Sequence, residues 1–249
     1  MFLMLWVNDF WTLNSIPKWL KHAVSGEDYL GFSDLIFPWF LFAIGLSIPF
    51  AFESRLLKGE NNVTIGKHIL LRTIALLVMG LFHMNMEMYN HQSSYISKPI
   101  FVIISTFAFF MIWNDHSRLK GKNDFFYKLL PFLGVTILII MFFIYRGQDY
   151  DGNAIGFRIH WWGILGLIGW VYSITAGTYF VFKKSIFALS IAFFISMILN
   201  CMDSSNISYA IFSWQKANWI PGSGGLQALS FGGIITSLCL IRYKNDIRI

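Results

Sequence analysis

The 249-residue sequence contains little charge. Only 13% of its residues are Asp, Glu, Lys or Arg, whereas soluble domains usually contain about 25%. With 56% apolar residues, 26 Phe, 10 Trp and a mean hydropathy of +0.57, the chain has too few polar side chains to cover a surface that faces water. This composition excludes a soluble enzyme, and it excludes a large soluble domain on a single membrane anchor.

The sequence also contains little cysteine. Its two cysteines, Cys201 and Cys239, form no CxxC or metal-ligand spacing, so they do not indicate a thiolate metal site. There is no low-complexity tract and no convincing internal repeat, and the polar loops are too short to hold a soluble domain. We therefore expect one domain over residues 1–249.

Long apolar runs make up most of the chain. About 20 residues of helix cross the hydrocarbon core of a bilayer. We assign seven apolar runs, each bounded by charged or turn residues, as full spans: 35–52, 69–82, 99–113, 129–145, 161–182, 185–202 and 225–241. Residues 1–13 form an eighth run that reaches only about 20 Å at 1.5 Å per residue. The expected fold is an all-α polytopic transmembrane helix bundle with about seven full spans and one partial N-terminal span.

Small residues recur on one face of the fifth full span. Gly169, Ser173 and Gly177 lie four residues apart. Such spacing lets helices approach closely in lipid, so we expect this face to pack against a neighbouring helix.

The basic residues are distributed unevenly between the two sides of these runs. Thirteen Lys and Arg side chains fall in one set of alternate loops and at the C-terminal end, and six fall in the other set. Because cytoplasmic loops carry an excess of Lys and Arg, this bias predicts that both chain ends are cytoplasmic. It also explains the formal net charge of +6 without a nucleic-acid partner, and we expect none. A phosphate-binding or membrane-surface role for some cations stays open.

Ionisable side chains are absent from the interiors of the runs from residue 99 onward. Ion-coupled transporters and pumps usually need acidic or histidine relays there, so this absence counts against ion coupling. Four histidines, His22, His83, His91 and His160, fall on the predicted outer side. No pair of them has the i, i+4 or HExxH pattern that fixes two ligands on one helix, and we expect no metal.

His22 differs from the other histidines in its sequence neighbours. Its loop follows a run that contains Asn8 and precedes a run that opens with Asp34. A loop tied to the membrane at both ends can fold back and bring the amide, the imidazole and the carboxylate together. Imidazole acts as a base or nucleophile, a carboxylate fixes its tautomer, and an amide donates to a developing oxyanion. His22, Asn8 and Asp34 are therefore the candidate catalytic residues, with an ordinary solvated loop histidine as the alternative.

Three stretches of this region resemble one family of multi-span acyltransferases. They are Val7-Asn8, Trp19-Leu20-Lys21-His22-Ala23 and residues 31–47, GFSDLIFPWFLFAIGLS. Their order and spacing resemble the heparan-alpha-glucosaminide N-acetyltransferase family, and above all its bacterial branch, whose members are largely of unknown function. The resemblance is strong over residues 1–52 and is supported by Leu71-Arg72-Thr73 and the glycine-rich residues 161–170.

The resemblance implies transfer of an acetyl group from cytoplasmic acetyl-CoA, through the membrane, to an amine or hydroxyl of an amino-sugar or glycan acceptor. In the family, the histidine that matches His22 is catalytic and the asparagine that matches Asn8 assists it. Lys67 and Arg72 are candidates for holding the phosphates of CoA, and a snorkelling side chain is the alternative for Arg72. The resemblance also implies a bacterial inner membrane and an upstream half-span, so we expect an N-terminally truncated chain.

Two other functions stay open at this stage. One is a non-enzymatic carrier or flippase of a lipid-linked or sugar substrate, whose transport would be insensitive to CoA and to substitution of His22. The other is an inactive remnant with a structural role. The acceptor, the acyl chain and the oligomeric state, including a homodimer, also stay open.

Overall fold

The computed structural model of the chain describes residues 2–13, 15–24, 26–115, 124–149, 151–159, 163–205 and 223–247. It divides into two compact units. Unit 1 consists of Met1–Leu71 and Trp170–Ile249, and unit 2 consists of Arg72–Gly169. One domain over the whole chain stays a prediction.

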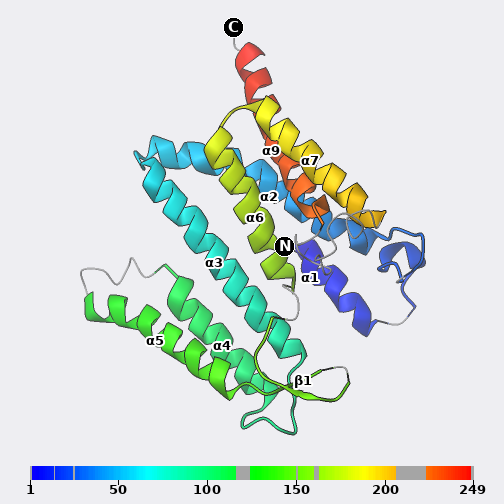
Figure 1. The fold of residues 1–249 in the computed structure, drawn as a ribbon, viewed down its shortest axis with the longest axis vertical. Helices are drawn as coiled ribbons and strands as arrows, with labels where there is room; N and C mark the ends of the chain where they lie inside the picture. The colour runs from blue at the N-terminus through cyan, green and yellow to red at the C-terminus, as the bar shows by residue number, and fades with distance from the viewer. Residues whose placement is uncertain are drawn as a thin grey trace. The chain divides into compact units, whose positions relative to one another are not determined.

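Helices account for nearly all regular structure in the described residues (Figure 1). In chain order the described elements are α1 (Phe2–Asn8), η1 (Asp9–Thr12), η2 (Lys18–Leu20), α2 (Phe32–Leu57), α3 (Asn62–Glu87), α4 (Lys98–Trp113), α5 (Asp124–Ile144), β1 (Gly147–Gln148), β2 (Ala154–Ile155), α6 (Gly163–Phe182), α7 (Ile186–Ser204) and α9 (Gly225–Ile247). The two strands pair antiparallel. The chain passes from unit 1 to unit 2 within α3 and returns within α6.

The helices confirm the predicted fold class, an all-α polytopic membrane bundle. Each of the seven predicted spans coincides with a helix. Five of the helices, α2, α3, α6, α7 and α9, are long and apolar enough to cross a membrane, while α4 and the apolar part of α5 are shorter. The first run forms only the seven residues of α1 and the four of η1. The chain is therefore an integral membrane protein whose solvent is the lipid bilayer.

In unit 1, α9 packs between α2 and α7 (Figure 1). A Cβ on Gly45 of α2 would lie 1.9 Å from the carbonyl oxygen of Ser230 of α9, and a Cβ on Gly233 of α9 would lie 2.2 Å from the carbonyl oxygen of Phe42 of α2. Glycine at both positions thus lets the two backbones touch. The hydroxyl of Ser237 on α9 donates to a backbone carbonyl of α2 at 2.7 Å. Beside this crossing lies a core of Ile48, Ala176, Tyr179, Leu189, Phe231, Ile234 and Leu238.

In unit 2, α4 and α5 lie side by side (Figure 1), and the rings of Phe82 on α3 and Phe109 on α4 meet with centroids 5.7 Å apart. The fully buried Asn85 of α3 forms hydrogen bonds to the segment after β2. Its Nδ2 donates to the carbonyl oxygens of Leu81 at 2.8 Å and Arg158 at 2.9 Å, and its Oδ1 accepts from the Arg158 N–H at 3.2 Å. The β1–β2 segment is thereby held against the C-terminal part of α3.

Candidate functional site

His22 lies beside Asp34 at the start of α2. The Nδ1 of His22 is 2.7 Å from Oδ1 of Asp34, and the two side chains are 37% and 22% exposed. The other carboxylate oxygen, Oδ2, accepts from the backbone N–H groups of Ala23 at 3.0 Å and Gly31 at 2.9 Å. Asp34 therefore binds the loop through residues 22 and 23 and the helix start through residue 31, and the structure brings His22 and Asp34 together.

The local sequence explains why the loop lies so close to the helix. A Cβ on Gly31 would lie 1.8 Å from the carbonyl oxygen of Lys21, so only glycine permits this approach. The buried Ser33 donates its hydroxyl hydrogen to the carbonyl oxygen of Leu20. A carboxylate in the first turn also interacts favourably with the positive end of the helix dipole. Backbone contacts and the first turn of α2 thus set the position of residues 20–23.

A second set of contacts, around Lys18, holds the outer part of the loop. Lys18 forms an ion pair with Glu27, and its Nζ lies 4.8 Å from the ring centroid of Tyr29. The hydrogen bond from Lys18 holds the pKa of Glu27 below its ordinary value of 4.5. Exposed pairs of this kind contribute little to stability, but this one closes the segment between η2 and α2 at neutral pH.

The His22–Asp34 pair has the geometry of a histidine base. A carboxylate only accepts hydrogen bonds, so Nδ1 of His22 carries the hydrogen, and Nε2 is the basic nitrogen of the neutral ring. Two backbone N–H donors fix the carboxylate, and the carboxylate in turn fixes the orientation of the imidazole. This arrangement suits proton transfer to and from Nε2.

Asn8 is the last residue of α1, and its side chain lies outside the described residues. The helix that carries it lies beside the start of α2, because the rings of Trp6 and Phe32 meet with centroids 6.4 Å apart. Val7, the residue before Asn8, is buried. The role of Asn8 at the site stays a prediction.

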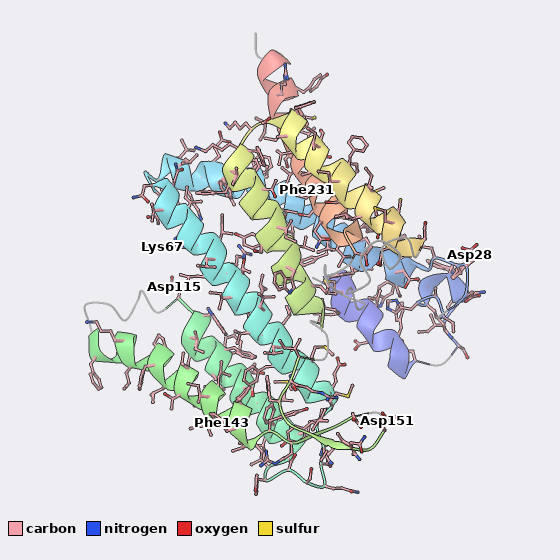
Figure 2. The ribbon with its side chains drawn as sticks, viewed as in Figure 1. Asp28, Lys67, Asp115, Phe143, Asp151 and Phe231 are labelled. Carbon is pink, nitrogen blue, oxygen red and sulfur yellow. The ribbon has the colours of Figure 1, made fainter. Side chains whose placement is uncertain are left out.

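Lys67 and Arg72 are both exposed on α3. Five residues of helix turn through about 140°, so the two cations point from different faces of α3. Lys67 (labelled in Figure 2) belongs to unit 1 and Arg72 to unit 2. Near the start of α3, Glu60 forms an ion pair with Arg55 at 2.9 Å. The structure does not present Lys67 and Arg72 as a pair, and their binding of CoA phosphates stays a prediction.

The described histidines of the predicted outer side, His83 and His91, form no cluster of metal ligands with His22. His83 is exposed, with Nδ1 3.3 Å from the carbonyl oxygen of Met79, and His160 lies outside the described residues. Within the described ranges, no three side chains of His, Cys, Asp or Glu come close enough together to hold a metal ion.

Two residues of the site were not predicted to have their roles, Gly31 and Ser33. Their signal is a helix start: a glycine, a serine and an acidic residue stand directly before a long apolar run, a pattern typical of an N-terminus. The side-chain and backbone contacts across the loop depend on its fold and have no sequence signal of their own.

A family comparison covers most of the chain. Residues 14–229 match the model of a family described as "Domain of unknown function (DUF5009)". The match includes His22, Asp34, Lys67 and Arg72 and begins after Asn8. No curated protein and no solved structure matches the chain. Because the matched region is much more than half of the sequence, the chain belongs to the DUF5009 family.

Proposed function

We propose that this membrane protein is an acetyltransferase that uses acetyl-CoA as the donor and an amine or hydroxyl of an amino-sugar or glycan as the acceptor. The observation that carries the proposal is the 2.7 Å contact between Nδ1 of His22 and the carboxylate of Asp34, which two backbone donors fix at the end of a membrane-spanning helix. The resemblance of residues 1–52 to the heparan-alpha-glucosaminide N-acetyltransferase family supports it.

In the proposed reaction His22 is the general base. Its Nε2 takes a proton from the acceptor as the acceptor nitrogen or oxygen attacks the thioester carbonyl carbon. The carbon–sulfur bond then breaks, and Nε2 returns the proton to the leaving sulfur, so the products are the acetylated acceptor and the thiol of CoA. Asp34 stabilises the imidazolium formed between these steps, and Asn8 donates a hydrogen bond to the carbonyl oxygen as it gains charge. In a variant of this scheme Nε2 itself accepts the acetyl group and passes it on.

The length of α2 suits a reaction across the membrane. Asp34 stands in its first turn and Arg55 in its last, and 26 residues of helix extend about 39 Å. Two basic residues, Arg55 in the last turn and Lys58 directly after the helix, therefore lie at the end of α2 opposite the His22 site. We place that basic end in the cytoplasm of a bacterial cell, with Lys67 and Arg72 as the cations for the phosphates of the donor.

The test is acetyl transfer by purified protein in proteoliposomes. Radiolabelled acetyl-CoA is supplied on one side and glucosamine on the other, for wild type, His22→Ala, Asp34→Asn and the control His83→Ala. Because general base catalysis contributes roughly 10²–10⁴-fold, His22→Ala should reduce the rate by at least about 100-fold. Asp34→Asn should give a smaller loss with the protein still folded, and His83→Ala should match wild type.

Full transfer by His22→Ala would refute the assignment of His22. A chain that moves a lipid-linked sugar across the bilayer without CoA, at a rate that His22→Ala leaves unchanged, would instead be a carrier. Proteoliposomes of the same preparation, loaded with a fluorescent polyprenyl-linked sugar, distinguish the two outcomes.

A further inference from the structure

Unit 2 contains an apolar groove with a volume of about 580 Å³. Its walls come from α3, α4 and α5 and include Ile74, Val78, Trp113, Val135, Ile139 and Phe143. Every lining residue is aliphatic or aromatic. Pockets for polar small molecules also contain a few placed polar groups, so the lining favours a hydrocarbon occupant.

The groove opens on a surface that has the character of a lipid-facing one. On α5, Val135 is 45%, Ile139 52% and Phe143 70% exposed. In an integral membrane protein such apolar surface contacts acyl chains, and an open apolar groove in it is filled by hydrocarbon from the bilayer.

One end of the groove carries positive charge. Arg72 precedes Ile74 by two residues on α3, and Lys128 lies two turns before Val135 on α5. Both are exposed, and both stand toward the end where α4 finishes at Trp113 and α5 begins. Asp115 is exposed at this end too (labelled in Figure 2 at the opposite end of the α4–α5 pair from Phe143). Among the described side chains, two cations against one carboxylate leave this end net positive.

We propose that the groove is a binding site for an anionic phospholipid, with one acyl chain between α3 and α5 and the phosphate at the end that bears Arg72 and Lys128. Trp113 is the last residue of α4, and indole rings prefer the membrane interface, so we place the glycerol backbone of the lipid beside it. Basic sites between membrane helices bind anionic headgroups in this way. The proposal does not require acetyl transfer, but it shares Arg72 with the proposed CoA site. Lys128, which that site does not use, is therefore the cation that the test removes.

The test is native mass spectrometry of delipidated protein titrated with phosphatidylglycerol or phosphatidylcholine. Val135→Trp and Ile139→Trp fill the groove from exposed positions, and Lys128→Gln removes one cation. Val181→Trp on α6, which is 68% exposed, and Lys58→Gln are the matched controls. Thermal unfolding of each variant shows whether it is folded, and having two filling variants keeps the test valid if one is not.

Wild type should bind phosphatidylglycerol more tightly than phosphatidylcholine. Either filling variant should lose the tightly bound lipid, and Lys128→Gln should weaken phosphatidylglycerol binding about fivefold, the effect of one cation near a membrane surface. The controls should match wild type. Wild-type lipid binding by both filling variants, equal binding of the two lipids, or equal loss in Val181→Trp would overturn the proposal. A change in oligomeric mass in place of lipid loss would also overturn it, because the groove would then bind a second copy of the chain.

Discussion

Gly45→Ala should destabilise the packing of α2 against α9. The added Cβ would lie 1.9 Å from the carbonyl oxygen of Ser230, whereas ordinary contacts begin at 3.4 Å. The helices must therefore separate locally by about 3.4 − 1.9 = 1.5 Å. A movement of this size would carry the Ser237 hydroxyl, now 2.7 Å from the carbonyl oxygen of Leu46, out of hydrogen-bond range.

The expected cost follows from three contributions. Forcing a methyl group into a packed interface costs about 1–3 kcal/mol, and loss of the Ser237 hydrogen bond costs about 1 kcal/mol. Alanine is favoured over glycine in a helix by roughly 0.5–1 kcal/mol, which offsets part of this. The net free energy of unfolding should fall by about 2 kcal/mol, which corresponds to a drop in melting temperature of roughly 4–8 °C for a chain of this size.

Thermal unfolding in detergent, followed by circular dichroism, measures the effect. Gly177→Ala is the matched control, since it changes glycine to alanine in α6, where a Cβ would meet nothing within 4 Å. The control should be as stable as wild type or slightly more so. If Gly45→Ala melts at the wild-type temperature, the close contact of the two backbones is wrong.

Three other predictions concern the loops. Gly31→Ala should leave the protein folded but displace the His22 loop, and trypsin should then cleave residues 18–21 faster. In the control Gly156→Ala the added Cβ meets nothing within 4 Å, so this variant should be cleaved at the wild-type rate. Asn85→Ala should lower the free energy of unfolding by about 2–3 kcal/mol in a denaturant or thermal titration, because the fully buried Asn85 makes three hydrogen bonds that are lost. The Lys18–Glu27 ion pair should persist above pH 4.5 and break as the pH falls below it, since the folded-state pKa of Glu27 is lowered. Limited pepsin digestion at a series of pH values measures this, with Lys18→Met as the control. Cleavage of the loop should increase with falling pH only in wild type.

Hydropathy located seven apolar helices, five of them long enough to cross a membrane, because the signal is local: a helix that crosses lipid must be apolar along its own sequence. The helix ends were less predictable. The run 69–82 marks only the middle of α3, which extends from Asn62 to Glu87, because backbone hydrogen bonding continues past the apolar residues into polar ones. The pairing of β1 with β2 was not predicted, since strands of two residues are too short to show an alternating pattern.

Helix contacts were harder to predict than helices. Of the small residues expected to pack closely on α6, Gly169 does so, with its added Cβ 3.0 Å from Cβ of Leu76, whereas Gly177 faces open space. The closest approach between two described helices, at Gly45 and Gly233, was not predicted. A glycine allows a close contact, but which helix supplies the other side depends on how the whole chain folds. The contact between His22 and Asp34 could be predicted from the sequence, because only 12 residues separate them. A common binding site for Lys67 and Arg72 could not be predicted from the sequence, because two cations in one helix need not point the same way.

Two glycines position the proposed base through α2, and they act on different parts of it. Gly31 lets the His22 loop lie against the first turn, and Gly45 lets the middle of the helix lie against α9. Loss of transfer in Gly45→Ala would therefore follow from a change in the bundle as a whole and would say little about the site. Loss of transfer in Gly31→Ala, with the melting temperature kept, would separate the orientation of His22 from the stability of the helix that carries Asp34. That variant tests whether the carboxylate–imidazole contact matters for chemistry or only for the fold of the loop.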